Sequence, residues 1–219
     1  MPKTALWRAA FFLSGAAMMA GGPRHPSPHL DLPFRESMAM MLENPEWVPS
    51  HLFILLSFVL LAAGLALWRR DAGPAARGHA WSRLALAAAG LAVVEMALHS
   101  AAVLDAAHLR AGQATPILTT HLVLTAVVNP LLGLALGGLA LQGARAGRIG
   151  SRWIAWMAVL GGAAYGVAGT CVVLTHDQRV SPLFAVGSSL LAFWLLLAAV
   201  WPLRAPASAR AGVPRSVAA

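Results

Sequence analysis

Five long apolar stretches restrict what this chain can fold into. They cover residues 51–68, 84–105, 117–141, 153–174 and 183–203. Each is close to or above the roughly 20 residues that a helix needs to cross a bilayer. A sixth and weaker stretch, 5–22, is interrupted early by Arg8. A soluble protein could not cover the apolar surface of a 219-residue chain that is 58% hydrophobic and 11% charged.

The composition of these stretches also decides their secondary structure. Lipid offers no hydrogen-bond partners to backbone polar groups, so spans of this kind must be helices. The sequence therefore predicts an all-α fold: a polytopic integral membrane bundle of six transmembrane helices, the first one weak. A single domain would occupy residues 1–204, and the Ala-, Arg- and Pro-rich tail, 205–219, is expected to be disordered in the cytoplasm.

Basic residues give the orientation. If six helices alternate, twelve of the sixteen Lys and Arg residues fall on one side: Lys3, Arg8, Arg69, Arg70, Arg77, Arg83, Arg145, Arg148, Arg152, Arg204, Arg210 and Arg215. The positive-inside rule then places both termini in the cytoplasm. Arginine greatly outnumbers lysine, which is typical of a GC-rich bacterial genome and favours a bacterial inner membrane. Scattered arginines beside apolar spans favour contact with lipid and argue against nucleic acid.

The first apolar stretch has a second interpretation. Lys3 and Arg8 precede an apolar run that ends in small residues, which also resembles a secretory signal peptide covering about residues 1–20. Met18 and Met19 fit the cleavage pattern poorly, so we expect a retained helix. Either outcome leaves the other five spans in the same orientation.

One long loop, residues 23–49, lies on the predicted outer side and has two interpretations. Residues 33–44 have the spacing of a short amphipathic helix, which would lie on the membrane as a lid or anchor. Alternatively, soft thioethers and imidazoles in this loop would bind copper(I). That patch would consist of Met38, Met40, Met41, His25 and His29.

The histidines are distributed as unevenly as the arginines. Seven of the eight fall on the predicted outer side, and four predicted helices each bring one toward that face: His51, His99, His121 and His176. Glu95 lies four residues before His99, hence on the same helix face. Helix geometry puts His99 roughly 9 Å and Glu95 roughly 15 Å below the outer helix end. His121, on the antiparallel next helix, reaches nearly the depth of His99.

Imidazoles on facing helices are the ligands that a haem iron or a transition metal requires. We expect His99 and His121 to bind haem b or a zinc, copper or iron ion, with His51 or His176 supplementary. The matched depth of His99 and His121 slightly favours haem, with electrons passing to a quinone or another membrane subunit. Glu95 would be a metal ligand, an orienting partner or, with Asn129, part of a proton relay.

Other interpretations stay open, including whether the chain is an enzyme at all. Histidines at helix ends and in bundle interiors commonly serve as interfacial or hydrogen-bonding residues, which would suit a structural, assembly or sensory subunit without a cofactor. A small proton-coupled transporter would use Glu95, Asn129 and the kink at Pro130. The pairs Gly133-x3-Gly137 and Gly162-x3-Gly166 predict close helix packing, within the chain or in a homo-oligomer.

Overall fold

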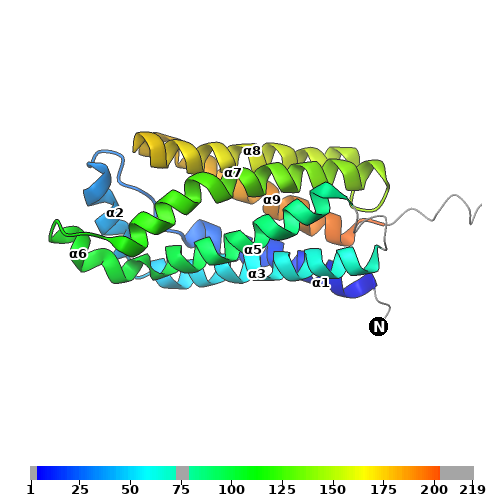
Figure 1. The fold of residues 1–219 in the computed structure, drawn as a ribbon, viewed down its shortest axis with the longest axis horizontal. Coiled ribbons are helices and arrows are strands. Elements are labelled where there is room, and N and C mark those ends of the chain that lie inside the picture. The colour runs from blue at the N-terminus through cyan, green and yellow to red at the C-terminus, as the bar shows by residue number, and fades with distance from the viewer. Residues whose placement is uncertain (1–3, 73–78, 203–219) are drawn as a thin grey trace, which may run out of the picture.

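The computed structural model describes residues 4–72 and 79–202. Six long helices account for most of them (Figure 1). Their bounds are α1 (Thr4–Gly21), α3 (Trp47–Asp71), α5 (Ala80–Ala101), α7 (Pro116–Arg145), α8 (Arg152–Thr175) and α9 (Pro182–Val200). Shorter helices join them: η1 (Gly22–Arg24), α2 (Phe34–Leu42), η2 (Ala102–Asp105), α6 (Ala106–Arg110) and η3 (Gln178–Val180). The described residues contain no strand, which confirms the all-helical class.

The six long helices form a closed ring. Each packs against the preceding and the following one, and α9 returns to pack against α1. Successive helices run in opposite directions, so the connections alternate between the two ends (Figure 1). The end covered by α2 and α6 is called here the α2 end. Large apolar side chains such as Val127, Leu134 and Leu160 remain exposed on the outside of the ring, as expected of a surface that faces lipid.

Five helices in the described part of the chain are long and apolar enough to cross a membrane. They are Trp47–Asp71, Ala80–Arg110, Pro116–Arg145, Arg152–Thr175 and Gln178–Val200. The expected sixth span is the helix α1, which does not belong to this set. It is nevertheless one of the six helices of the ring and packs against α3, where its Ser14 Oγ donates a hydrogen bond of 2.8 Å to Ser57 O. Six membrane crossings and the side of each terminus therefore stay predictions, and the tail from 203 onward lies outside the described residues.

Glycines let α7 and α8 approach each other closely. A Cβ atom on Gly133 would lie 2.1 Å from Gly162 O, and one on Gly162 would lie 2.5 Å from Gly133 O. Gly166 similarly contacts the Cα atom of Pro130, and Gly137 faces Val159. The glycine pairs predicted to mediate packing are thus covered within the chain. Their close contact holds the α7 residues near Pro130 at a defined position relative to α8.

The short helices α2 and α6 form a cap over the α2 end of the bundle, held by apolar and polar contacts. The side chains of Ala39, Leu42, Trp47, Ala102, Leu109 and Leu118 form a small buried cluster between α2 and the α5–α7 connection. Arg35 donates two hydrogen bonds to Leu109 O, at 2.9 and 2.8 Å, and Arg110 forms an ion pair with Glu43. Ser37 Oγ donates a bond of 2.7 Å to Gln178 Oε1. These contacts connect α2 to both α6 and η3, the short helix before α9.

The helix α3 begins four residues earlier than the expected span. Trp47 is its first residue, so His51 lies in the second turn instead of opening the helix. Pro49 does not prevent this, because backbone N–H groups in a first helical turn have no intrahelical acceptor to lose. The earlier start moves His51 from the helix end into the interior, where it is fully buried.

Candidate metal centre

Four histidines from four segments meet inside the α2 end, and we call them the histidine cluster. His25 follows η1, His51 lies in α3, His99 near the end of α5 and His121 in α7. The centroids of neighbouring rings are close: 4.7 Å for His25 and His51, 4.4 Å for His51 and His99, and 3.9 Å for His99 and His121. His25 also lies 5.9 Å from His99. The contacts therefore run continuously through all four rings.

His51 presents one free ring nitrogen. Its Nδ1 is hydrogen-bonded to the backbone oxygen of Trp47. A carbonyl oxygen only accepts, so Nδ1 carries the proton and Nε2 keeps its lone pair. Nε2 is fully buried and has no hydrogen-bond partner. A buried acceptor without a partner is costly to folding, and this one is oriented as metal-binding imidazoles are, by a hydrogen bond at the opposite nitrogen.

His25 has the same arrangement in the loop. Its Nδ1 donates a 2.8 Å hydrogen bond to Pro26 O, which leaves Nε2 unprotonated. Burial lowers the pKa of His25, and this outweighs the opposing effect of the bond to Pro26; the nearby His121 lowers the pKa further. The lowered pKa favours the neutral ring, the state in which imidazole binds a metal.

His121 is oriented by a carboxylate. Its Nδ1 lies 2.9 Å from Glu95 Oε1, and Thr125 Oγ1 donates a 2.7 Å hydrogen bond to the same oxygen. Glu95 is only 2% exposed, and its second oxygen, Oε2, is buried without a hydrogen-bond partner. An ionised carboxyl in a bundle interior is expensive unless it is partnered. The pair Glu95–His121 therefore leaves two groups available for a ligand: His121 Nε2 and Glu95 Oε2.

His99 joins the two halves of the cluster. Its ring contacts those of His25, His51 and His121, and the Trp47 indole lies 5.0 Å away on the same side of the bundle. Trp47 is held in place by a bond of 3.3 Å from its Nε1 to Ser100 O. No side-chain hydrogen bond is formed by His99 within residues 4–72 and 79–202.

Two overlapping triads in this cluster could hold a metal ion. One is His25, His51 and His99, and the other is Glu95, His99 and His121; in each triad the ligand atoms lie within 4.8 Å of one another. Two ligands of one ion are at most about 4.2 Å apart, twice a metal–nitrogen bond of about 2.1 Å. Small inward movements would therefore close either triad around an ion. Neutral imidazoles suit zinc, copper, iron and nickel, whereas magnesium and calcium prefer oxygen.

A cavity of about 370 Å³ adjoins the cluster. His25, His99, His121 and Glu95 line it together with Thr125, Asn129 and Tyr165, which lie deeper in the bundle. Its walls are mainly apolar and include Trp47, Phe34, Phe184 and the methionines 18, 38, 41 and 96. Its volume is in the range of small-molecule sites. An ion bound by the histidines would therefore be accessible to a second ligand.

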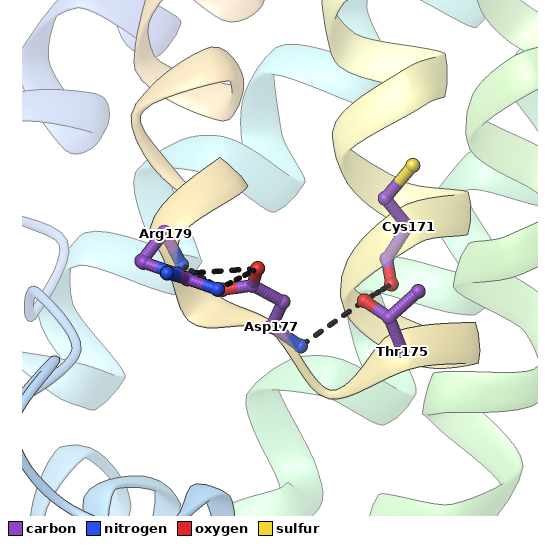
Figure 2. A network of polar contacts seen from close by, with 4 residues as sticks. All are labelled: Cys171, Thr175, Asp177 and Arg179. Carbon is purple, nitrogen blue, oxygen red and sulfur yellow. Dashed lines mark hydrogen bonds and ion pairs between the residues drawn. The ribbon is translucent and has the colours of Figure 1, made fainter.

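The structure does not bring His176 to the cluster. This residue ends α8 in the left-handed conformation, with φ of 56°, and its exposed ring stacks on Phe34 at 4.8 Å. The surrounding turn is fixed by hydrogen bonds (Figure 2): Thr175 Oγ1 donates to Cys171 O, Asp177 N donates to Thr175 Oγ1, and Arg179 is paired with Asp177. His176 belongs to neither ligand triad.

Some of the other predicted site residues line the cavity, and others are exposed on the surface. Asn129 is buried and lines the cavity, but it is not a member of a ligand triad. Of the expected copper patch, His25, Met38 and Met41 line the cavity, whereas His29 and Met40 are exposed. Sequence reasoning assigned His25 only to that patch and missed its contact with the other histidines. Its flanking prolines indicate a stiff loop, but nothing in their spacing shows where the loop leads.

Comparisons with known protein families, with curated proteins and with solved structures find no match to this chain.

Proposed function

We propose that this chain is a membrane metalloprotein that binds one transition-metal ion at His25, His51 and His99. The observation that carries the proposal is the orientation of the rings. His25 and His51 each use Nδ1 on a carbonyl oxygen, and the Nε2 of His51 is buried without a partner. A bound ion would satisfy that nitrogen and offset the cost of collecting neutral imidazoles in a bundle interior.

The neighbouring pair Glu95–His121 supports a site that does more than hold an ion. Three histidine ligands leave at least one coordination position open, which is the pattern of catalytic rather than structural sites. His121 lies beside His99 and faces the cavity, with its Nδ1 held by Glu95. Its Nε2 is thus a positioned proton acceptor next to the open position. The metal would supply Lewis-acid or redox chemistry, and the pair would accept a proton from the molecule in the cavity.

The arrangement favours a metal ion over haem b. A haem iron between His99 and His121 needs a metal–nitrogen bond of about 2 Å on each side. Together with the rings themselves, those bonds would hold the centroids well beyond the 3.9 Å found here. The two rings therefore leave no space between them for a macrocycle.

The cavity also disfavours a transporter. The cavity extends as far as Asn129 and Tyr165. Leu65, Leu132 and Leu136 are almost completely buried inside the helix bundle. Beyond Asn129, α7 carries only apolar residues until Gln142. We place the α2 end on the extracytoplasmic side of a bacterial inner membrane, because the last turns of α3 and α7, at the other end, carry Arg69, Arg70 and Arg145.

The test is the metal content of the protein purified in detergent. We expect about one zinc, copper, iron or nickel ion per chain by mass spectrometry, and a loss of that ion in His51→Ala and His99→Ala. The exposed His29 and His176 offer matched controls, since His29→Ala and His176→Ala should retain the ion. Equal metal content in all four variants, or none in the wild type after growth with each metal, would reject the proposal.

A further inference from the structure

The cavity has a polar floor beside the metal site. Glu95 Oε2 is buried and unpartnered, because both of its neighbours, His121 and Thr125, contact Oε1. Asn129 and Tyr165 also line the cavity, and within the described residues neither side chain forms a hydrogen bond. A carboxylate oxygen needs a donor, and the Tyr165 hydroxyl and Asn129 amide offer both donors and acceptors. These three groups therefore match a ligand with a hydroxyl, which can donate one hydrogen bond and accept others.

The rest of the cavity matches an apolar and aromatic body. Phe34, Trp47, Tyr165 and Phe184 enter it from α2, α3, α8 and α9. Aromatic walls on several sides favour a ring, which they can contact face-on or edge-on. Methionines 18, 38, 41 and 96 add adaptable apolar contacts around the ring.

The position of the mouth indicates where such a ligand would come from. Phe184, Ala185 and Ser188 on α9, and Ser181 just before it, line the cavity, and Ala185 is exposed. Residues 22 and 23 of η1 and the loop residues 25–28 also line the cavity. The α9 residues belong to the candidate span Gln178–Val200, within its first half. The exposed Ala185 therefore points to a mouth that would open sideways, at the level of the lipid leaflet near the α2 end.

We infer that the cavity binds a membrane-soluble phenol or hydroquinone whose ring hydroxyl donates a hydrogen bond to Glu95 Oε2. This assignment rests on the proposed function for its chemical purpose, because the bound hydroxyl would lie beside the histidine cluster. Its binding geometry depends only on Glu95, the aromatic walls and the mouth at α9. The proton acceptor closest to such a hydroxyl is the pair Glu95–His121.

The experiment compares 4-butylphenol with its methyl ether, 4-butylanisole, by calorimetric titration of the detergent-solubilised full chain. The two probes have similar apolar bodies, but only the phenol can donate a hydrogen bond. A bond to a charged acceptor predicts that the phenol binds roughly tenfold or more tightly than the ether. Glu95→Leu, which removes the acceptor, should abolish this preference. Equal affinity of the wild type for both probes would overturn the inference.

A second pair of variants tests the mouth without changing the site. Ala185→Trp should fill the opening on α9 and weaken phenol binding at least tenfold. Val186→Trp is the matched control, because Val186 is exposed on the same helix and lies outside the cavity lining. Equal binding by the two variants would overturn the proposed mouth.

Titrations on protein incubated with and without metal separate the two proposals. Phenol preference in a protein that takes up no metal would contradict the metal site alone. Stoichiometric metal uptake without phenol preference would contradict this inference alone.

Discussion

At the scale of single residues, the cluster is defined by which nitrogen of each ring is already engaged. Pro26 O, Trp47 O and Glu95 Oε1 each contact an Nδ1 atom, of His25, His51 and His121 respectively. Because these oxygens accept, the Nε2 atoms keep their lone pairs. Purely structural histidines in a bundle would use both nitrogens for hydrogen bonds, whereas His51 leaves one buried nitrogen unused. The unused nitrogen is the reason to favour a metal site over a packing role.

Glu95→Gln should weaken metal binding without removing it. The amide keeps the shape of the side chain but loses the negative charge, which lies close to the ligand His99 and would offset the charge of the ion. Mutation of a polar group next to the ligands typically costs about 10–100-fold in metal affinity, and we expect a reduction of that order in competition with a chromogenic chelator. The control is Glu36→Gln, at an exposed position on α2. Unchanged affinity in Glu95→Gln would show that this carboxyl has no part in the site.

At the scale of helices, the cluster depends on how segments are positioned against one another. Close approach at Gly133 and Gly162 sets the height of α7, and with it the height of His121. The cap over the α2 end brings the loop with His25 onto α3 and α5. Only His51, His99 and His121 belong to long helices, so His25 is the ligand whose position depends on the cap.

Gly133→Ala should strongly destabilise the bundle. The added Cβ atom would lie 2.1 Å from Gly162 O, a backbone atom that cannot move aside without shifting α8. Overpacking of this kind typically costs about 1–3 kcal/mol, or more where backbone must move. Gly90→Ala is the matched control, because its Cβ atom meets nothing within 4 Å. Thermal unfolding in detergent should show a lower midpoint for Gly133→Ala and an unchanged or slightly higher one for Gly90→Ala; equal midpoints would disprove the close contact.

The ion pair between α2 and α6 should make the cap sensitive to acid. The hydrogen bonds from Arg110 lower the pKa of Glu43 below its usual value of 4.5. Its stabilising effect is therefore fully present above pH 4.5 and is lost as the pH falls through the lowered pKa. We expect Glu43→Gln to unfold at a slightly lower temperature than the wild type at pH 7, and the difference to disappear in strong acid. A difference that stays constant with pH would contradict this assignment.

At the scale of the whole molecule, the sequence predicts the bundle better than the site. Apolar length and helix geometry are local properties, and they were sufficient to place His99 and His121 at one depth. His25 could not be placed in this way, because its position follows from contacts between α2, α6 and η3, which are far apart in the sequence. His176 illustrates the reverse case: it is near the correct depth, but the left-handed turn after α8 directs it to Phe34. The earlier start of α3 buried His51 more deeply than its place near an apolar boundary suggested.

Cysteine labelling tests the proposed orientation of the bundle. In a Cys171→Ala background, Ser27→Cys and Ala146→Cys place one exposed thiol at each end. A membrane-impermeant maleimide should label Ser27→Cys in intact cells and should reach Ala146→Cys only after lysis. Labelling in the opposite order would place the histidine cluster near the cytoplasm.

The most direct measurement is X-ray absorption spectroscopy of the metal in the purified protein. We predict a shell of nitrogen ligands at about 2.0–2.1 Å with the outer-shell scattering of three imidazoles, and the loss of one imidazole in His25→Ala. A spectrum without imidazole scattering, or one that is identical in His25→Ala and wild type, would contradict a metal held by His25, His51 and His99.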